Sequence, residues 1–595
     1  MQTVEEVAQE EAAEASVRRR RGPADVWALL SYAVLSLLVM SQLWRDPNGR
    51  VLAGNKDDHN VFLFMLAHGE RVVFHGDNPF YSGRLNVPDG VNMMANTSVL
   101  VFSLPLAPVS HFLGVGFSVA LLLTLGLAGT AAAWYYVLSR HLVTSRVAAW
   151  IGGLWCGFAP TMISHANGHV NFVSLFVVPF IVWQVLRLRE PGRAVRGGVI
   201  LGLLIVLQVF INEEALLFTA LALGAFVVAY GLMAWTDAKR EAPHLLKGLG
   251  VAALVSGVLL AYPLWYQFFA PGNYHGQPFE PDMYATDLAS LGFFARQSLA
   301  GYAALTREMS VSATEDNTFF GPFGLLMIIV SIVVLWRSVA ARAAAISAFV
   351  LLVVSMGPEL VVFGHRTGVP LPFALISHVP IIDLVSVTRF AMVPATIAGV
   401  LLALATDRAR AFPVRKKRLF QVGLVLALVP LFPKPVPVIQ GDPMPPFLTQ
   451  GIWKQYVTGD RTLVTVPLPE VTTGRTGMRW ATLSHLDYPT PRGYFMGPVN
   501  PPTDNTGSWN APRRFTSDLL YSVREYGIRP RLTATDRARI TADLTFWRAA
   551  VVILVPDSRN GDDLLATLTD ALGPPQLIGG VEMWDVRYLS VPSNE

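Results

Sequence analysis

The acidic pair Asp57-Asp58 lies in a long polar segment, residues 45–97, that follows the first apolar stretch of the chain. The segment also carries three histidines, several asparagines, and prolines and glycines that favour turns. Long connections without strong hydrophobic periodicity are uncommon and are often functional. We therefore predict a loop that supplies the polar half of an active site at the membrane surface. The other side chains of this loop that we assign to substrate binding are His75, Asn78, Asn92 and Asn96.

Further ionisable side chains lie at the ends of apolar stretches. Ionisable groups near membrane depth are energetically costly, so they are functional candidates by default. A carboxylate could take a proton from a hydroxyl group, and a cation could hold phosphate oxygens and stabilise a leaving group. This inventory suits a reaction between a lipid-linked phosphate and a polar acceptor. The candidates at these ends, all assigned to substrate binding, are His165, His169, Asn171, Glu213, Glu214 and Arg389.

Each candidate also has a purely structural interpretation. The acidic pair could cap a helix or form a turn, and Glu213-Glu214 could begin a helix, where the helix dipole favours acids. A histidine at a helix end is more often a hydrogen-bonded structural residue than a ligand or a base. Arg389 could be an anchor at the membrane interface. The prediction of a site depends on the co-location of these residues rather than on any one of them.

The composition indicates a protein that faces lipid. The chain has 595 residues, of which 52% are hydrophobic and only 15% are charged, whereas a soluble protein carries about 25% charged residues. The net charge is +4, and the basic residues cluster in short loops, which indicates topology signals and no nucleic-acid partner. The single cysteine, Cys156, lies in an apolar run and is expected to pack rather than react.

Apolar runs divide the first part of the chain into predicted membrane spans. Residues 1–26 are predicted to be a disordered cytoplasmic N-terminus, and Arg18 to Arg21 precede a first span that lacks a cleavage site and is therefore a retained anchor. A span must cross about 30 Å of hydrocarbon. We predict about eleven spans, at 27–44, 117–138, 147–163, 170–187, 197–212, 214–236, 249–267, 320–336, 343–357, 389–406 and 419–433.

Charge alternates between the predicted loops. Every second loop is basic and is placed in the cytoplasm, whereas the loops between them carry the candidate polar residues and face outward. This alternation requires that the apolar block 98–115, which contains Pro105 and Pro108, does not cross the membrane. We predict that it lies along the outer membrane surface as a helix; a kinked additional span is the alternative.

The last part of the chain is predicted to be a separate domain. Residues 434–446 form a proline-rich linker with an extended bias. Residues 447–595 then read as a compact extracytoplasmic α/β domain. Its predicted strands are 461–468, 549–556 and a segment near 577–589, and its predicted helices are 514–527, 534–547 and 562–572. The fold class is therefore mainly α, a polytopic transmembrane helix bundle (27–433) followed by this mixed domain.

Short motifs along the chain are informative in combination. They are DHNVFLFMLAH (58–68), NPFYSGRLNVPDGVNMMANTS (78–98), LPLAP (104–108), GFAP (157–160), HANGHVN (165–171), INEEALL (211–217), VTRFAMVPATIAGVLLALA (387–405) and RWATLSHLDYPTPRGYF (479–495). In this order they resemble the GT-C superfamily of membrane glycosyltransferases, which use polyprenyl-phosphate sugars, and more narrowly a bacterial branch of that superfamily. LPLAP falls where relatives have a surface helix with a pair of prolines.

The resemblance implies a catalytic aspartate in the first outer loop and a one-step inverting reaction. Relatives usually have Gly-Asp where this chain has Lys56-Asp57-Asp58, so both aspartates remain candidates. Asp58 is preferred as the base, with Asp57 as an acceptor or a metal contact. Some members of the superfamily use a divalent metal and others do not, and the sequence leaves this open.

The predicted function is transfer of a sugar from a polyprenyl-phosphate donor in the bilayer to a cell-envelope glycan, lipid or protein. Two other classes remain as alternatives. A transporter or flippase for a lipid-linked sugar would be expected to show two related halves with broken helices at mid-membrane, and no such internal symmetry is visible. A non-catalytic partner in envelope assembly would use the C-terminal domain as its binding module.

Overall fold

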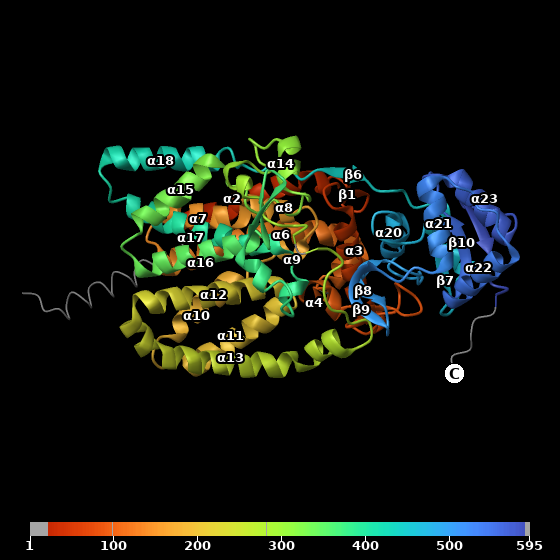
Figure 1. Cartoon of the computed structure of the whole chain (residues 1–595), viewed down its shortest axis with the longest axis horizontal. Coiled ribbons are helices and arrows are strands. Elements are labelled where there is room, and N and C mark those ends of the chain that lie inside the picture. Colours follow the sequence, from red (N-terminus) through yellow and green to blue (C-terminus); the bar gives the residue numbers. More distant parts are fainter. Residues whose placement is uncertain (1–21, 98, 281, 590–595) are drawn as a thin grey trace, which may run out of the picture.

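The computed structural model describes residues 22–97, 99–280 and 282–589. Figure 1 shows an elongated bundle of helices with a smaller module of strands and helices at one end, formed by the last part of the chain. Of the predicted disordered N-terminus, residues 1–21 lie outside the described residues. Residues 23–26 form the first turn of helix α2 (Pro23–Trp44), because Pro23 is favourable at the first position of a helix.

Six helical segments in the described part of the chain are long and apolar enough to cross a membrane. They are α2, α6 (Val115–Val137) with its continuation to Leu142, α7 (Arg146–Phe158) with α8 (Pro160–His165), α12 (Glu213–Met233), α13 (Trp235–Phe269), and η6 (Val387–Ala391) with α17 (Met392–Ala409). Four apolar helices are shorter, namely α10 (Val178–Leu188), α11 (Ala194–Val209), α15 (Gly321–Val334) and α16 (Val339–Ser355). These segments are consistent with a multi-pass membrane protein.

The predicted spans 170–187 and 419–433 differ from the helices observed there. Instead of one continuous helix, the first contains α9 (Val170–Val173) and α10, which four residues separate. The second overlaps α18 (Val414–Leu428), which has only 15 residues and begins with a run of cations. The number of helices that cross the membrane therefore stays a prediction.

Helices α6 and α7 approach each other closely at a glycine. A Cβ atom on Gly157 would lie 2.5 Å from the Cβ of Ala131 and 2.9 Å from its Cα. Small residues at such crossings let helix backbones pack by van der Waals contact, which is a main source of helix association in membranes.

Gly157→Ala should therefore destabilise the bundle by about 1–3 kcal/mol through overpacking. The matched control is Gly224→Ala on α12, where an added Cβ would have no atom within 4 Å and where alanine has the better helix propensity. Thermal unfolding of both variants in detergent measures the difference. An equal melting temperature for the two would show that the close approach does not stabilise the fold.

Two of the predicted basic loops meet at one end of the bundle. Asp25, at the beginning of α2, forms ion pairs with Arg140 and Arg146. Asp407, near the end of α17, accepts hydrogen bonds from the backbone N–H and hydroxyl groups of Thr144. The loop after α6 and the loop after α17 therefore share one end, as charge alternation requires. The side of the membrane on which this end lies stays a prediction.

The segment 45–97 is not the irregular loop that we predicted. It contains the helix α3 (Lys56–His75) and a small hairpin of β2 (Tyr81–Ser82) and β3 (Val91–Asn92). The Asn55 side chain caps α3 by accepting a hydrogen bond from the backbone N–H of Asp58. The apolar run 62–67 is buried along this helix. Packing in the core thus overrides the polar composition of the segment.

The predicted surface helix, 98–115, is divided into two short helices, α4 (Leu100–Ser103) and α5 (Ala107–Leu113). The division falls at Pro105, which cannot donate the backbone hydrogen bond of a continuous helix. Neither helix is long enough to span a membrane. Helix α3 packs against both α4 and α5. The same helix carries the candidate residues Asp57 and Asp58 in its first turn.

The predicted linker, 434–446, is tied to the bundle. Its strand β6 (Val438–Gln440) pairs antiparallel with β1 (Arg50–Leu52), directly after α2. The backbone N–H of Val436 also donates to the carbonyl of Val39. This pairing satisfies backbone groups that a free linker would leave to solvent.

The C-terminal module contains a four-stranded mixed sheet in the order β11-β12-β10-β7. β7 (Thr462–Val466) is parallel to β10 (Ala549–Leu554), while β12 (Val581–Asp585) is antiparallel to β10 and to β11 (Gln576–Ile578). The helices α21 (Phe515–Tyr526), α22 (Ala534–Phe546) and α23 (Gly561–Leu572) share one core with the sheet. These elements confirm the predicted strands and helices.

A second part of residues 447–595 leaves the sheet and lies on the bundle. α20 (Arg475–Leu483) packs against α3, and the hairpin of β8 (Tyr494–Asn500) and β9 (Asp504–Asn510) lies beside it (Figure 1). The sequence predicted neither feature. The C-terminal region therefore contributes side chains to the beginning of α3.

Candidate functional site

The site lies where the beginning of α3 meets the turn between α8 and α9. The Nε2 atom of His169 lies 2.7 Å from Oδ2 of Asp58, although the two residues are 111 positions apart in the chain. The hydroxyl group of Tyr494, on β8, donates to Oδ1 of Asp58 over 2.8 Å. Asp58 thus joins three separate parts of the chain.

Hydrogen bonds keep the Asp58 carboxyl ionised. Its side chain is 22% exposed, and burial by itself raises its pKa. The hydrogen bonds and charge of His169, together with the hydroxyl group of Tyr494, outweigh burial and lower the pKa to about 2. Asp58 is therefore an anion across the neutral pH range, and its basicity depends on which of these donors stay in place.

A second imidazole continues the chain from Asp58. Nδ1 of His165 lies 2.8 Å from Nδ1 of His169. If His169 is neutral and donates from Nε2 to the carboxylate, its Nδ1 must accept, so the proton between the two rings belongs to His165. Nε2 of His165 is then an acceptor; it is buried and has no hydrogen-bond partner among the described residues.

Arg389 lies between two acidic residues at the same end of the bundle. Nη1 of Arg389 is 3.0 Å from Glu214, at the beginning of α12, and Nη2 is 2.9 Å from Glu315. The guanidinium group also lies over the ring of Phe172, 4.8 Å from its centroid. The Arg389 side chain is 18% exposed, so its charge requires such partners.

Asp57 points away from Asp58 toward the C-terminal region. Arg475, the first residue of α20, binds it through two parallel hydrogen bonds of 2.6 Å. The backbone N–H of Thr472 donates to the same carboxylate over 3.2 Å. This paired geometry is characteristic of strong arginine–carboxylate contacts, and it gives Asp57 a contact with α20 rather than with the histidines.

Arg475→Ala should loosen α20 from α3. We expect a loss of about 1 kcal/mol in the free energy of unfolding, because the pair is partly exposed. Any activity centred on Asp58 should fall by up to about 10²-fold, because small displacements of reacting groups are costly. Arg475→Lys is the matched control, since it keeps the charge but loses the two-pronged contact. If Arg475→Ala has wild-type activity and stability, the contact does not position the site.

A cavity of about 230 Å³ lies beside these residues. Its lining includes Glu315 and Thr388, the neighbour of Arg389, together with Tyr284. Segments near 282–290, 308–319 and 361–366 form the remaining wall. The cavity therefore joins the long connections that charge alternation placed on the same face as the candidate residues.

Several predicted binding residues lie elsewhere. His75 is exposed at the end of α3, 17 residues after Asp58 and thus about 25 Å along the helix. Asn78 is exposed, and its side chain accepts a hydrogen bond from the backbone of Phe80. The structure does not bring these two residues to the aspartates, because a rigid helix lies where the sequence analysis assumed a loop that could fold back. Their assignment to substrate binding stays a prediction.

Other predicted residues are close to the site but have structural contacts. Asn92 donates to the carbonyl groups of Tyr266 and Pro271, and Asn96 exchanges hydrogen bonds with the backbone of Met496. Glu213 accepts from Gln267 on α13, so of the acidic pair only Glu214 contacts Arg389. Asn171 is buried on α9, and its Oδ1 atom has no hydrogen-bond partner among the described residues.

Glu315, Tyr494 and Arg475 are site residues that the sequence analysis missed. Glu315 lies in the stretch ATEDNT, inside a long connection that we predicted to face outward without choosing a residue. Its two acidic residues in a polar loop were a usable signal. Tyr494 belongs to the motif RWATLSHLDYPTPRGYF, and Arg475 lies four positions before the motif begins. Nothing in the sequence indicates that either residue contacts α3.

Three residues of the site fit a divalent cation. His165, His169 and Glu315 are all buried, and their potential ligand atoms lie within 4.8 Å of one another. Arg389 pairs with the carboxylates of Glu214 and Glu315, and a third carboxylate, Asp58, contacts His169. The cluster therefore has three carboxylates and one guanidinium group, and it carries excess negative charge when the imidazoles are neutral. The buried acceptor atom of His165 gives a further lone pair for a metal.

The fold is similar to that of known enzymes, although the sequence is not. No model of a known protein family matches the sequence, and no curated protein matches it. The crystal structure of the Archaeoglobus fulgidus oligosaccharyltransferase, tethered with an acceptor peptide containing the NVT sequon, superposes with a TM-score of 0.51 at 12% identity, covering 89% of this chain and 68% of that chain.

Two other solved structures are also similar. The archaeal oligosaccharyltransferase AglB from Archaeoglobus fulgidus, in complex with an inhibitory peptide and a dolichol-phosphate, has a TM-score of 0.51 at 12% identity, covering 96% of this chain and 75% of that chain. ArnT from Cupriavidus metallidurans in the apo state has a TM-score of 0.45 at 13% identity, covering 95% and 99%. The two archaeal structures show that this chain has the GT-C fold, as the sequence motifs predicted.

Proposed function

We propose that this chain, with its GT-C fold, is an integral membrane glycosyltransferase that moves a sugar from a polyprenyl-phosphate carrier to a cell-envelope glycan, lipid or protein. The observation that carries the proposal is the contact between Asp58 and His169 at the same end of the bundle as Arg389. Carboxylate, imidazole and guanidinium groups from five separate segments meet at the end of apolar helices. One of them, the carboxylate of Glu315, lines a cavity. Ionisable groups in such a position are energetically costly, and a chain usually keeps them only where they have a function.

The reaction is a single displacement with inversion. The acceptor oxygen or nitrogen attacks the anomeric carbon of the sugar, the bond from that carbon to the phosphate oxygen breaks, and the polyprenyl phosphate leaves with the bonding electrons. The proton of the acceptor passes to Asp58. Because the phosphate oxygens carry the additional negative charge without taking up a proton, the reaction requires only one general base and stabilisation of the phosphate.

Binding of the acceptor increases the basicity of Asp58. In the free protein, His169 and Tyr494 lower the pKa of this carboxyl group, and a carboxylate with a pKa of about 2 is a weak base. An acceptor that takes the place of the Tyr494 hydroxyl group removes one of these donors. Burial, which raises the pKa, then has the larger influence, and the carboxylate becomes a better base where the substrate is bound.

The phosphate side of the site has two potential sources of positive charge. The charge of Arg389 is neutralised by Glu214 and Glu315. Arg389 therefore holds these two carboxylates in position and has little net charge to offer the phosphate. A divalent cation, if the protein uses one, would be held by His165, His169 and Glu315 and would supply charge stabilisation to the phosphate oxygens. The donor tail would lie between apolar helices, and the site end and the C-terminal module would face outward from the cytoplasm.

The proposal is tested with purified protein in detergent, given a polyprenyl-phosphate-linked sugar and an envelope acceptor extract. A glycosyltransferase should release free polyprenyl phosphate in step with acceptor glycosylation, measured by chromatography and mass spectrometry. A flippase should instead move the intact carrier across proteoliposome membranes without releasing it, and an assembly partner should do neither. Intact carrier after prolonged incubation with a complete panel of donors would overturn the proposal.

A further inference from the structure

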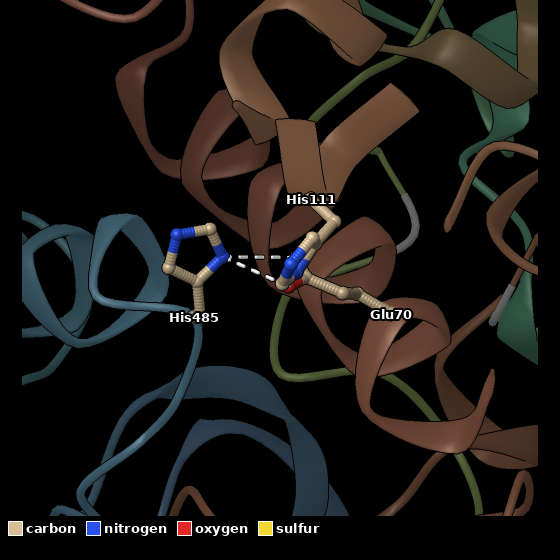
Figure 2. Close-up of side chains that lie close together, drawn as sticks. All are labelled: Glu70, His111 and His485. Carbon is tan, nitrogen blue, oxygen red and sulfur yellow. Dashed lines mark hydrogen bonds and ion pairs between the residues drawn. The ribbon is translucent and has the colours of Figure 1, made fainter. Parts of the chain in front are cut away.

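A second cluster of metal-ligating side chains lies outside the candidate site. Glu70 on α3, His111 on α5 and His485 directly after α20 come together from three separate segments (Figure 2). Glu70 is 12 residues after Asp58 on the same helix, about 18 Å away along its axis. The cluster therefore shares no residue with the candidate site.

The three side chains converge on one point. Nδ1 of His111 and Nδ1 of His485 each lie 2.8 Å from Oε1 of Glu70. The potential ligand atoms of the three residues all lie within 4.8 Å of one another. Figure 2 shows the two rings approaching the carboxylate from different elements, with the other nitrogen of His485 directed away from it.

The carboxylate of the cluster is buried, whereas both imidazoles are partly exposed. The Glu70 side chain is only 1% exposed, whereas those of His111 and His485 are 42% and 40% exposed. The carboxylate is thus fixed inside the protein, and the rings leave the outer side open to solvent. Phe74 holds the ring of His111 from one side, with ring centroids 4.8 Å apart.

The backbone at His485 has an unusual conformation. Both His485 and Leu486 have positive φ angles, 57° and 53°, a region that residues other than glycine seldom occupy. Leu486 and Tyr488 are fully buried immediately afterwards. The core therefore holds this turn in an unfavourable conformation that directs His485 toward Glu70, and such local strain is often associated with functional sites.

From this geometry we propose that Glu70, His111 and His485 bind one Zn²⁺ ion, with a water molecule as the fourth ligand. Two imidazoles, one carboxylate and an open position form a common zinc donor set. Ligands on a tetrahedral zinc ion, with bonds of about 2.0–2.2 Å, lie about 3.3 Å apart. The observed 2.8 Å contacts thus need to open by only about half an ångström. Mg²⁺ and Ca²⁺ prefer oxygen ligands, which the two rings do not offer.

Binding of Zn²⁺ requires that the proton of each imidazole lies on Nε2 and not on Nδ1. The oxidation state of the metal does not change. Where a ring contacts the ionised Glu70 carboxylate through Nδ1, it donates its Nδ1–H to that carboxylate. When Zn²⁺ binds, each Nδ1 lone pair goes to the metal, and the ring proton lies on Nε2, which can donate to solvent. The carboxylate, which accepts the hydrogen bonds from the two rings, exchanges them for one bond to the metal.

The ion would connect the C-terminal region to the bundle. α20 packs against α3, and its first residue, Arg475, binds Asp57. A zinc ion at the other end of α20 would fix this helix at a second point and would also fix α5. Its function would therefore be structural, and it would act on the candidate site only through the seating of α20.

Zinc content tests the proposal on the full-length protein. The protein is stripped with a chelator, given a small excess of ZnCl₂, passed through a desalting column and measured by mass spectrometry of the metal. The comparison is made in a Glu315→Gln background, so that the other candidate cluster is weakened in both samples. We expect about one zinc per chain in Glu315→Gln and at least fivefold less in Glu315→Gln/His111→Gln/His485→Gln.

His75→Gln is the matched control, because this histidine is exposed on the same helix but lies outside the cluster. It should hold as much zinc as the wild type. Zinc should raise the melting temperature of the wild type and of the control, and should slow hydrogen exchange in α20. Equal zinc content in the two Glu315→Gln samples would overturn the proposal.

Cobalt provides a second measurement if the double substitution prevents folding. Co²⁺ added to the stripped wild type should give the intense visible absorption of four- or five-coordinate cobalt with nitrogen ligands. The single variant His485→Gln, which changes a partly exposed side chain, should lose most of this absorption while keeping its far-ultraviolet spectrum. An unchanged cobalt spectrum in His485→Gln would exclude that residue as a ligand and would overturn the site.

Discussion

Asp58→Asn should lower sugar transfer by about 10²–10⁴-fold, the usual contribution of a positioned general base. Asparagine has nearly the same shape as aspartate but carries no charge and cannot take up the acceptor proton. It can still accept a hydrogen bond from Tyr494, which lies 2.8 Å from the carboxylate. The measurement is the initial rate of polyprenyl-phosphate release at saturating donor, together with the melting temperature in detergent.

Asp57→Asn is the matched control for this change, because it removes the same charge from the adjacent residue. Asp57 contacts Arg475 and not His169, so its substitution should weaken the seating of α20 and reduce the rate far less than Asp58→Asn. Normal turnover in a well-folded Asp58→Asn protein would exclude Asp58 as the base. A larger loss in Asp57→Asn than in Asp58→Asn would reverse the assignment of the two residues.

Arg389→Met should be among the most destabilising single changes at this end of the bundle. Methionine fills a similar volume, but it leaves Glu214 and Glu315 without their shared cation. Removing one partner of a buried ion pair costs about 3–5 kcal/mol, because an uncompensated charge remains. Urea or thermal unfolding in detergent measures this loss, and sugar transfer should fall with it.

A compensated variant separates the charge effect from packing. Glu315 is the more buried of the two carboxylates, with a side chain 5% exposed. If unpaired charge is the cause, Arg389→Met/Glu315→Gln should recover a large part of the lost stability, because it removes one of the two uncompensated acids. Recovery of stability without recovery of transfer would assign Arg389 a direct function in the reaction. No recovery of stability would show that Arg389 contributes mainly through packing, for instance on Phe172.

Some features of the site follow from local sequence patterns. Asn55 and the acidic pair begin α3, and Asn212 with its own acidic pair begins α12. The structural alternative for Glu213-Glu214, that they begin a helix, agrees with α12. The alternative for Asp57-Asp58 was a helix cap or a turn, whereas Asn55 is the cap and the two acids lie in the first turn of α3. Both helices present acids at their N-termini, where the helix dipole stabilises negative charge, and one acid of each pair turns toward the cluster of His169 and Arg389.

The sequence could not predict which acid of each pair contacts the candidate site. Adjacent residues at a helix N-terminus point in different directions, by about 100° per residue, and only the neighbouring elements decide which direction leads to the site. Arg475 forms an ion pair with Asp57, and His169 contacts Asp58. In the same way, Gln267 donates a hydrogen bond to Glu213, and Arg389 forms an ion pair with Glu214. Both partners that decide the matter come from segments more than 50 positions away.

The sequence by itself determined the class of fold and predicted the end of the bundle at which the candidate residues gather. Hydrophobic runs and the alternation of basic loops depend on local composition, and the membrane requires both of them. The tertiary structure alone decided that residues 45–97 contain a helix, that His75 and Asn78 lie far from the aspartates, and that Glu315, Arg475 and Tyr494 join the site. These outcomes depend on contacts between distant segments, in which burial and hydrogen bonding outweigh local preference.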